Sequence, residues 1–320
     1  MTDEPRTRTR KGTVLLVILS TPFLAFAFLR LFSVGGNRYI IAAIALTPYV
    51  AVVGLVLGAA GLLMRRWIFG GLVMAVALIT AAGVAPRFVA HASPDARGPK
   101  LVVMSANLYL GRADPGSVLD MVRTNQVDVL SLQELTQGTV DRLQRDGINA
   151  LLPYQIFQPG PDGTGTGSGL ASRFPLREEK FAEPASFAQP SAIVDVPGVT
   201  DPDILVVHTM PGVADAVTWK RELAQLPLPV FNVRPRLLVG DFNATLDHPG
   251  LRALTDRGYV DAAERRGRGL TPTWPATLWP PPVTIDHVLV DNRAAVDDYR
   301  VFDLPGSDHR AVVAWLTLPT

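Results

Sequence analysis

The 320-residue sequence contains no cysteine, which excludes a disulfide framework but leaves the cellular compartment open. Acidic residues are missing from residues 13–86, where the only charged residues are Arg30, Arg38, Arg65 and Arg66. Because transport pathways usually carry intramembrane acidic groups, this absence argues against a transporter. The glycine-rich stretch 160–169 is followed by no Gly-Lys-Ser/Thr. It therefore does not fit a P-loop, and we expect a flexible loop near a site.

The sequence also lacks the basic run that nucleic-acid-binding domains usually carry. Residues 100–320 contain 20 Lys and Arg against 26 Asp and Glu, so their net charge is −6, whereas the whole chain has +1. The densest basic cluster, Arg265-Arg266-Gly267-Arg268, fits a solvated turn as well as a loop that contacts phosphate. The charge of this part of the chain therefore weighs mildly against tight DNA binding.

The amino-terminal part contains three long apolar blocks, at residues 13–33, 39–64 and 67–86, which follow a basic tail at residues 1–12. A helix that crosses a bilayer needs about 20 apolar residues, so the sequence predicts three transmembrane helices. A cleaved signal peptide is the alternative for the first block, because Ala25-Phe26-Ala27 resembles a cleavage site. This site lies inside the apolar run rather than after it, which favours an uncleaved anchor.

Basic residues indicate the orientation of these helices, because they concentrate on the cytoplasmic side of a membrane. The amino-terminal tail and the turn at Arg65 and Arg66 are expected inside, by six basic residues against five on the other side. Three crossings predict a multi-pass protein of the cell membrane. Because their number is odd, the carboxy-terminal domain would be extracytoplasmic.

Beyond a segment at 90–99 that is typical of a linker, residues 100–320 alternate between strand-like and helix-like patterns. Helices are expected at 115–125, 137–146, 214–225 and 249–256, and Asp114 is a suitable N-cap for the first. Strands are expected at 101–104, 127–132, 169–172, 192–196, 204–207, 237–239, 283–290 and 311–316. Many strands with few helices predict an α/β domain with a substantial core.

Polar side chains follow several of these strands at the point where each strand ends or begins. Open α/β sheets bind ligands at strand ends, so residues placed there are candidates for one site. They are Asn107, Glu134, His208, Asp241 with Asn243, Asp286, and Asp308 with His309.

Carboxylate and amide oxygens among these residues indicate a cation site. An isolated Glu134 would more often cap a surface loop, but Mg²⁺ prefers a few oxygen ligands, and Asn107 and Asp308 supply two more. Asp241 and Asn243 flank Phe242, so an extended backbone would direct both side chains to one side. One could hold or deprotonate a water while the other donates to a phosphate oxygen. A loop without catalytic function has the same composition.

The pair Asp308-His309 places an acid beside an imidazole, and neighbouring side chains usually face different partners. A carboxylate from elsewhere in the chain would therefore have to orient the ring of His309 and stabilise its charged form. Asp286, in Thr284-Ile285-Asp286-His287, is the candidate. A surface Asp-His pair on a loop is the alternative.

The ordered set of motifs resembles the endonuclease/exonuclease/phosphatase superfamily across roughly residues 100–318. The motifs are Asn107, Gln133-Glu134, His208, Gly240-Asp241-Phe242-Asn243, Ile285-Asp286-His287 and Ser307-Asp308-His309. The resemblance implies a four-layer α-β-β-α sandwich with two mixed β-sheets. Here this fold would be preceded by an N-terminal three-helix transmembrane region. Thr273-Trp274-Pro275, ahead of Ile285-Asp286-His287, also resembles bacterial membrane-anchored members.

The resemblance also implies a role for each residue. Asn107, Glu134 and Asp308 would bind Mg²⁺, with Mn²⁺ as a substitute. Asp241 would position the attacking water, Asn243 and His208 would contact the phosphate, and His309, held by Asp286, would stabilise the transition state. Abasic-site endonucleases carry an Asp two residues after the first-motif Asn, where this sequence has Tyr109, and this difference weakens a DNA-repair assignment.

These expectations define a membrane-anchored, Mg²⁺-dependent phosphodiesterase. Its substrate would be a phosphodiester or phosphomonoester in a nucleic acid or a phospholipid, and no obligate protein partner is inferred. Trp274 and Trp279, on a proline-rich loop, either contact a membrane interface or cover the core. A binding or signalling module that kept the fold without catalysis is the alternative function.

Overall fold

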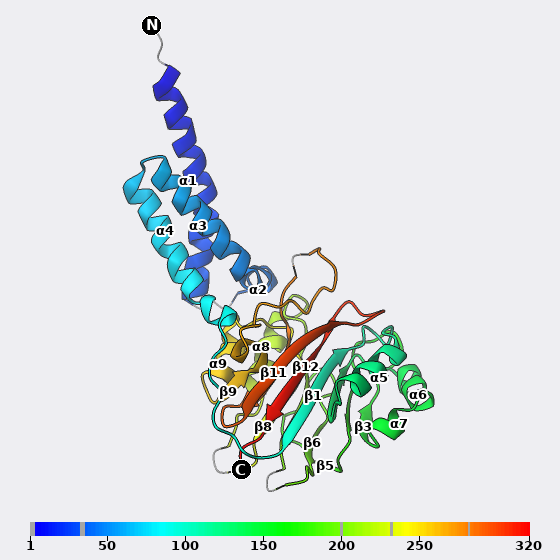
Figure 1. Cartoon of the computed structure of the whole chain (residues 1–320). Helices are drawn as coiled ribbons and strands as arrows, with labels where there is room; N and C mark the ends of the chain where they lie inside the picture. Colours follow the sequence, from blue (N-terminus) through cyan, green and yellow to red (C-terminus); the bar gives the residue numbers. More distant parts are fainter. Residues whose placement is uncertain (1–3, 33–35, 199–200, 231–232, 281) are drawn as a thin grey trace. The chain divides into compact units, whose positions relative to one another are not determined.

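The computed structural model describes residues 4–32, 36–198, 201–230, 233–280 and 282–320. By its internal contacts the chain divides into two compact units, Met1–Pro86 and Arg87–Thr320. The first consists of helices, and the second contains the β-sheets (Figure 1).

The first unit contains the helices α1 (Glu4–Leu31), α2 (Arg38–Ala45), α3 (Thr47–Leu63) and α4 (Trp67–Ala82). Only Lys11–Leu31, with 21 residues, has by itself the length and apolar composition of a membrane span. The helices α2 and α3 pass that test only as a pair, and they are bent by 70° at their junction. Helix α4, with 16 residues, is shorter than a span. The described residues therefore do not support the predicted three transmembrane helices.

Proline explains the bend in the second apolar block. Pro48 has no N–H to donate to the carbonyl of Ile44, one turn earlier, and its ring disfavours a continuous helix. The hydroxyl of Thr47 instead donates to the carbonyl oxygen of Ile44 at 2.6 Å. The block at 39–64 is apolar throughout, but its backbone changes direction at Leu46.

The predicted orientation depended on the number of crossings. With one helix of sufficient length, or at most two if the bent pair is one span, the argument from an odd number of three crossings no longer holds. The multi-pass topology and the extracytoplasmic placement of the carboxy-terminal domain are therefore not supported.

Small residues allow α3 and α4 to pack closely. A side chain at Gly58 would lie 2.8 Å from the backbone of Met74, and one at Gly61 would lie 2.7 Å from the Cα atom of Gly70. Close backbone approach through small residues is typical of helices that associate in lipid. Many large apolar side chains of this unit are exposed, and Leu63 and Ile68 are 85% and 92% exposed.

We expect Gly58→Leu to destabilise this unit, because the new side chain would overlap the backbone of α4. Overpacking of this kind costs about 1–3 kcal/mol. Gly71→Leu is the matched control, since nothing lies within 4 Å of a side chain at that position. Circular dichroism of the full chain in detergent should show an earlier loss of helix on heating for Gly58→Leu only. Equal melting of the two variants would contradict the close packing of α3 on α4.

The second unit contains two six-stranded sheets. The first has the order β11-β12-β1-β2-β4-β3, and the second has the order β5-β6-β7-β8-β10-β9. The first comprises β1 (Lys100–Asn107), β2 (Val129–Gln133), β3 (Tyr154–Gln158), β4 (Ser168–Ser172), β11 (Ala295–Asp303) and β12 (Arg310–Thr317). The second comprises β5 (Leu176–Glu178), β6 (Ser191–Val194), β7 (Asp203–His208), β8 (Arg236–Asp241), β9 (Tyr259–Asp261) and β10 (Asp286–Asp291).

Both sheets are mixed. The pairs β1–β2 and β7–β8 are parallel, while β1–β12 and β8–β10 are antiparallel. The prediction of an α/β domain with two mixed sheets is confirmed. The eight predicted strands are all present, and β3, β5, β9 and β11 were not predicted.

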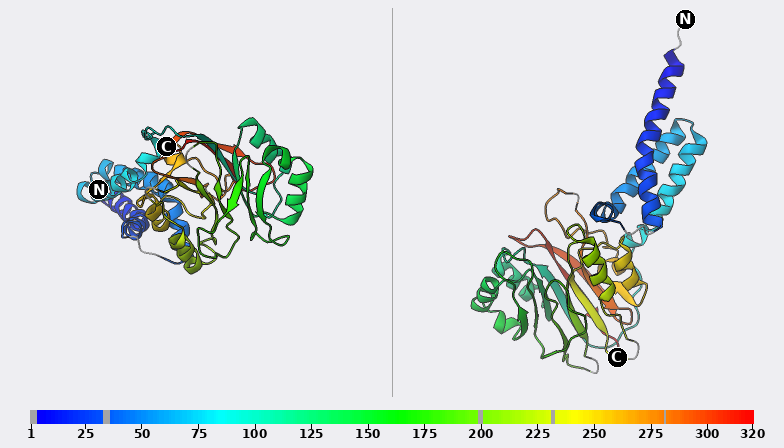
Figure 2. Two further views of the ribbon diagram at one scale, coloured as in Figure 1. Left: turned by 90° about the horizontal axis from the view of Figure 1, so that it is seen from below. Right: turned by 180° about the vertical axis from the view of Figure 1, so that it is seen from behind.

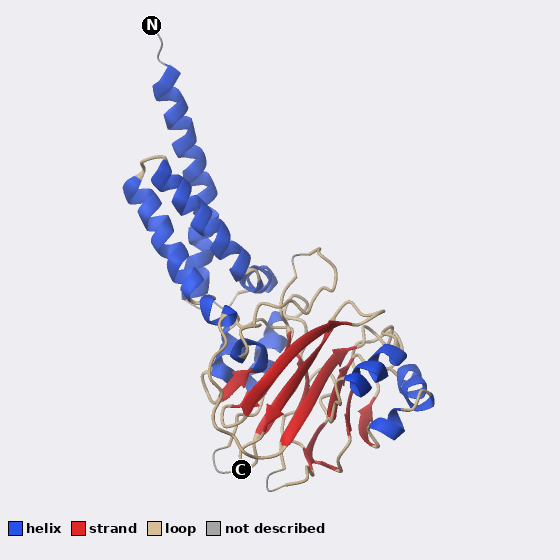
Figure 3. Cartoon of the chain, in the orientation of Figure 1, coloured by secondary structure: helices blue, strands red, loops and turns tan. Residues whose placement is uncertain are grey.

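The helices of this unit lie outside the two sheets (Figure 3). The four predicted helices correspond to α5 (Pro115–Thr124), α6 (Gln137–Arg145), α8 (Ala216–Gln225) and α9 (Pro249–Thr255). The predicted N-cap is confirmed, because Asp114 accepts a hydrogen bond from the amide of Ser117 at 2.8 Å. The short elements η1 (Ala85–Phe88), α7 (Ile148–Leu151) and α10 (Ala262–Arg265) were not predicted.

Two apolar clusters hold these layers together. The larger lies between the sheets and joins side chains such as Val103 and Val129 to Val206 and Val239. The second lies between the outer face of the first sheet and the helices α5 to α7, and Figure 2 shows these helices flanking that sheet. A strand buried on both faces is apolar at nearly every position, which is why the inner strands read as continuous apolar runs.

The segment predicted as a linker, 90–99, is packed against the domain. Ala90 forms a β-bridge with Arg266, and the amide of His91 donates to the carbonyl of Arg265 at 2.9 Å. The side chain of Arg265 donates to the carbonyl of Ala92, and Arg268 donates to that of Tyr299. Two arginines of the basic cluster therefore bind the chain itself.

Candidate active site

The ends of the central strands bring the predicted side chains of both sheets together. In the second sheet His208 is paired with Asp241, and Asp241 with Asp286, so the three form one row across β7, β8 and β10. Residues directly opposite one another on paired strands share a face of the sheet. In the first sheet Asn107 is paired with Gln133, which directly precedes Glu134.

A continuous series of contacts joins Glu134 to His309. The amide nitrogen Nδ2 of Asn107 lies 3.2 Å from Oε1 of Glu134 and 3.1 Å from Oδ2 of Asp241. That oxygen of Asp241 is 3.8 Å from Nε2 of His309, and Nδ1 of His309 is 2.9 Å from Oδ2 of Asp286. Residues as far apart in the sequence as Asn107 and His309 thus form one cluster, in which Asn107 bridges the two sheets.

Asp241 occupies the centre of this cluster and is almost fully buried. Its Oδ1 accepts a hydrogen bond from the amide of Asn243 at 2.8 Å. Burial, and then the negative charge of Asp286, raise the pKa of Asp241 above its usual value, although His309 partly opposes this. A carboxylate with a raised pKa is a better proton acceptor than an exposed one.

His309 is held between two carboxylates. Burial alone would lower the pKa of its ring, but the charge and the hydrogen bond of Asp286, and then the charge of Asp241, raise it to about 10. The ring is therefore cationic at neutral pH, with Nδ1 donating to Asp286 and Nε2 directed toward Asp241. This arrangement places a positive charge beside a buried carboxylate, at the ends of the strands.

His208 differs from His309 although both rings are buried. Burial, and then the positive charge of His309, lower the pKa of His208 to about 3. Its ring is therefore neutral, stacks against Phe187 with centroids 4.5 Å apart, and leaves Nδ1 without a partner among the described residues. Gln189 fixes the backbone by donating to the carbonyl of His208 at 2.9 Å. A neutral imidazole with a free nitrogen can bind or relay one proton.

Glu134 is held by an unusual turn. Its own φ is +56°, and Tyr109, Leu110 and Gly111 also have positive φ, at +46°, +55° and +74°. The amide of Leu110 donates to Oε2 of Glu134 at 2.7 Å. Left-handed conformations of non-glycine residues cost free energy and persist where the surroundings impose them, often at functional sites.

The glycine-rich stretch 160–169 lies beside Glu134, as the sequence suggested. A side chain at Gly165 would lie 3.3 Å from the carboxyl carbon of Glu134. The stretch is also bonded to the residue that follows Glu134, because the amide of Gly160 donates to the carbonyl of Leu135 at 2.9 Å. Glycine at position 165 therefore permits the loop to approach the carboxylate.

Asp308 faces Trp274 rather than its neighbour His309. Its Oδ2 accepts a hydrogen bond from the indole nitrogen of Trp274 at 3.1 Å. Its Oδ1 is buried and has no hydrogen-bond partner in the described part of the chain. A buried carboxylate oxygen without a partner is costly, so this atom marks a position where an added donor or cation would be stabilised.

The predicted geometry of Asn243 was wrong. The extended backbone expected around Phe242 does not continue, because Asn243 has φ +47° and its amide turns back to Oδ1 of Asp241. Its side chain nevertheless stays close, with Nδ2 donating to the carbonyl of Thr209 at 2.9 Å and lying 3.5 Å from Asp241. An Asx-type turn, rather than strand alternation, brings the two side chains together.

The sequence reasoning missed the residues that support this cluster. The hydroxyl of Thr273 accepts hydrogen bonds from the amides of Ile285 and Asp286, at 3.0 and 3.1 Å. Trp274 bonds Asp308, and its ring lies 6.3 Å from that of His309. The sequence indicated Thr273 and Trp274 only by a family resemblance and by a proline-rich loop, and nothing local indicated that they join two motifs.

Proximity alone would also allow a metal at Asp241, Asp286 and His309, whose ligand atoms lie within 4.8 Å of one another. An imidazole must be neutral to bind a metal, whereas Asp286 holds the ring of His309 in its charged form. A cation bound by this trio would therefore have to displace the proton that Asp286 holds on the ring of His309.

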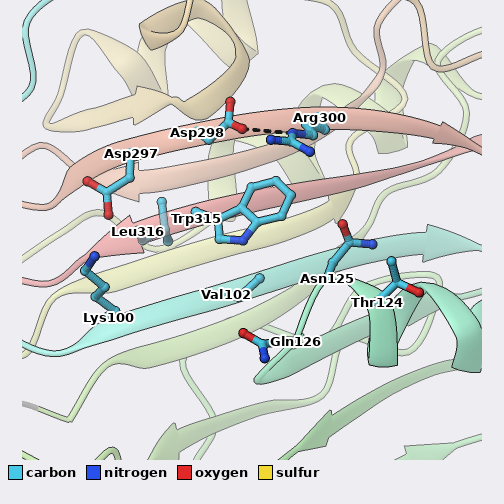
Figure 4. Close-up of a pocket in the computed structure, with 10 residues that line it drawn as sticks. All are labelled: Lys100, Val102, Thr124, Asn125, Gln126, Asp297, Asp298, Arg300, Trp315 and Leu316. Carbon is cyan, nitrogen blue, oxygen red and sulfur yellow. Dashed lines mark hydrogen bonds and ion pairs between the residues drawn. The ribbon is translucent and has the colours of Figure 1, made fainter.

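A cavity of about 460 Å³ lies elsewhere (Figure 4). It is lined by side chains such as Lys100, Arg300 and Trp315, together with residues at the end of α5. Lys100 begins β1, whereas Asn107 ends it. The cavity thus occupies the opposite end of the first sheet and contributes none of the clustered residues.

Comparison with known proteins identifies the family. Residues 104–309 match the Endonuclease/Exonuclease/phosphatase family. This match covers more than half of the chain, so the chain belongs to that family, whose members are hydrolases of phosphoester bonds. The resemblance inferred from the motifs is confirmed. Comparison with curated proteins gives no match.

Solved structures show the same fold. The endonuclease/exonuclease/phosphatase from Beutenbergia cavernae DSM 12333 is 19% identical, with a TM-score of 0.52 over 69% of this chain and 72% of that chain. A family protein from Leptotrichia buccalis C-1013-b is 13% identical, with a TM-score of 0.50 over 68% and 99%. D. rerio TDP2, complexed with single strand DNA product, is 15% identical, with a TM-score of 0.50 over 68% and 98%.

We expect Asp286→Asn to lower the pKa of His309, because it removes the negative charge and leaves burial to dominate. The chain has five histidines, so NMR of the metal-free protein with labelled histidine rings can follow each titration. The parental His309 should remain protonated at pH 8, and the variant should not. Asp261→Asn is the control: it removes the partner of His287, 2.7 Å away, and should leave His309 unchanged. A parental His309 that titrates near pH 6.5 would contradict the assignment.

Proposed function

We propose that this protein is a Mg²⁺-dependent phosphodiesterase that uses water as the nucleophile. The observation that carries the proposal is the series of contacts from Glu134 through Asn107 and Asp241 to His309 and Asp286. These contacts support it, because carboxylate and amide oxygens lie in one cluster with an imidazole at the strand ends. Phosphoester hydrolysis uses oxygen ligands for a metal, a proton acceptor and a group that stabilises negative charge.

The residues present fit a divalent cation. Glu134 offers a carboxylate, and Asp308 offers a buried oxygen without a partner in the described residues. Asn107 uses its Oδ1 to accept one hydrogen bond from the amide of Tyr109, which leaves a second lone pair. We assign Glu134, Asn107 and Asp308 to Mg²⁺, which, when bound, would neutralise charge on the phosphate.

Asp241 and His309 are the proposed catalytic pair. The raised pKa of Asp241 makes its carboxylate a suitable acceptor for a proton from water, and its hydrogen bonds to Asn107 and Asn243 fix its orientation. The charged ring of His309, oriented by Asp286, would bind a phosphoryl oxygen and stabilise the negative charge that develops there.

His208 and Asn243 are the proposed phosphate contacts. His208 is neutral and keeps Nδ1 free among the described residues, so its ring can contact an oxygen without adding charge. One N–H of the Asn243 amide donates to Thr209, and the other is directed toward Asp241 at 3.5 Å, the limit of a hydrogen bond. That second N–H is therefore available to a substrate.

We expect Asp241→Ala and His309→Ala to reduce kcat/KM for a soluble phosphodiester by about 10²–10⁴-fold, the usual contribution of a positioned acid or base. Glu134→Gln should raise the Mg²⁺ concentration needed for half-maximal rate, because it removes the ligand charge. The measurement is hydrolysis of bis(p-nitrophenyl) phosphate by the full chain in detergent, with EDTA as the metal-free reference.

Asp297→Asn serves as the control, since this carboxylate lines the cavity at the opposite end of the first sheet. It should hydrolyse the substrate at the parental rate. Thermal melting separates loss of activity from loss of fold. Parental turnover by either alanine variant would show that the assigned roles are wrong.

An exposed apolar loop supports a phospholipid as the substrate. Leu278 and Trp279 are 86% and 81% exposed, so Trp279 does not cover the core. The loop is tied to the site, because the amide of Ala276 donates to the carbonyl of Asp308 at 2.7 Å. A nucleic acid is the second candidate, since D. rerio TDP2 was solved with single strand DNA product. The net charge of −6 for residues 100–320 favours the lipid.

Residues 11–31 would keep such an enzyme at its substrate. This helix has the length and composition of a membrane span, and tethering raises the effective concentration of a bilayer substrate. We therefore propose that the chain is anchored by this helix. Full-length protein should sediment with lipid vesicles, whereas protein that stays soluble without detergent would contradict the anchor.

We expect the double variant Leu278→Ser/Trp279→Ser to hydrolyse vesicle phospholipid at least tenfold more slowly, while its rate on bis(p-nitrophenyl) phosphate stays parental. Burying two such side chains is worth about 3 kcal/mol or more, and each 1.4 kcal/mol corresponds to tenfold. Val217→Ser is the matched control, because Val217 is 78% exposed on α8. Faster hydrolysis of single-stranded DNA than of phospholipid would instead favour the nucleic acid.

A further inference from the structure

A buried ion pair joins the start of the second unit to the loop that carries Asp241. Arg87 directly follows the apolar unit Met1–Pro86, yet its side chain is only 5% exposed. Its Nη1 donates to Oδ2 of Asp247 at 2.6 Å, and its Nη2 donates to Oδ1 at 3.0 Å. The carboxylate of Asp247 is fully buried. The two residues are 160 positions apart in the chain.

Asp247 belongs to the segment 241–248, here called the Asp241 loop. Other side chains of the domain also hold this loop. Thr209 and Trp219 donate to the carbonyl of Phe242, at 2.6 and 3.3 Å, and His287 lies 2.9 Å from that of Ala244. Those contacts are made to the first half of the loop. Arg87 contacts the second half through Asp247, and the ring of Trp219 lies against His248 there, with centroids 5.0 Å apart.

The geometry of this pair favours positioning over simple stabilisation. A buried ion pair loses much of its attraction to desolvation and often contributes no more than an apolar pair of the same volume. A guanidinium that engages both oxygens of a carboxylate, however, fixes its direction as well as its distance. The backbone of Arg87 is also fixed, because its carbonyl accepts from the amide of Gly269 at 3.2 Å.

We propose that Arg87 is a positioning residue for catalysis, which acts through Asp247 on the Asp241 loop. This inference rests on the proposed hydrolase function. Without Arg87, the buried carboxylate of Asp247 would lose two charge-assisted hydrogen bonds, and the loop would shift in response. Asp241 and Asn243 would then leave the positions that the reaction requires, and a displacement of about 1 Å can cost a hundredfold in rate.

Because Arg87 is the first residue of the second unit, cleavage of the chain near this point would affect the contact with Asp247. A domain released by cleavage on the carboxyl side of Arg87 would keep each residue assigned to the metal and the phosphate. It would lose the guanidinium that orients Asp247. The proposed activity thus depends on the segment that follows the apolar helices, not on the sheets alone.

The test compares Arg87→Met with Arg236→Met in the full chain in detergent. Arg236 forms a partly buried ion pair, with Asp203 at 2.8 Å. This pair joins the first residues of β7 and β8, at the opposite ends of these strands from His208 and Asp241. Hydrogen exchange of a peptide covering 242–248 reports on the loop without any substrate. Hydrolysis of bis(p-nitrophenyl) phosphate then gives kcat and KM.

For Arg87→Met we expect faster exchange in 242–248, a kcat lower by at least about tenfold, and a KM within about threefold of the parent. Arg87→Lys should recover part of kcat, because it restores the charge without the two-pronged geometry. Arg236→Met should lower the melting temperature without changing kcat or exchange in 242–248.

The proposal is overturned if Arg87→Met exchanges at the parental rate in 242–248, or if both methionine variants show the same exchange and the same kcat. Should Arg87→Met not fold, Arg87→Lys and Asp247→Asn carry the same comparison. A parent that hydrolyses no phosphodiester would contradict the proposed function, whereas the exchange measurement would still decide the effect of Arg87 on the loop.

Discussion

The hydrogen bonds of one amide, Asn107, hold the candidate site together. This side chain ends β1 in the first sheet, and its Nδ2 reaches Asp241 in the second sheet at 3.1 Å while also contacting Glu134. The space between the sheets is apolar along most of its length, but becomes polar near this end, where Ser131 donates to the carbonyl of Val239 at 2.8 Å. Because the sheets pack face to face, that polar end fixes how their strand ends align.

Charge balance determines what the cluster can do. Two buried carboxylates, Asp241 and Asp286, would repel each other, and the ring of His309 lies between them as a cation. This explains why two buried histidines differ: His309 is charged by its carboxylates, while His208 is kept neutral by burial and by His309. The backbone strain at Glu134 fits the same picture, since the packed surroundings impose a conformation that the isolated chain would avoid.

Whether a strand could be predicted from the sequence depended on its position in the sheet. The eight strands found by their apolar runs are the inner strands, and the four missed ones, β3, β5, β9 and β11, are the four edges. Inner strands are buried on both faces, so they are apolar throughout. An edge strand such as β11, with Asp297 and Asp298, is partly solvated and carries charge. The same reliance on apolar runs overcounted the membrane helices, because composition does not reveal the bend before Pro48.

The sequence alone determined which residues stand at strand ends, and the order of its motifs indicated the family. Strand ends are local features, so residue type and spacing are enough to find them. Only the tertiary structure decided that Asn107 would bridge to Asp241, that Asn243 would turn back, and that Arg87 would reach Asp247. These contacts join residues up to 160 positions apart. Their geometry depends on how two sheets and their loops pack, which no local pattern encodes.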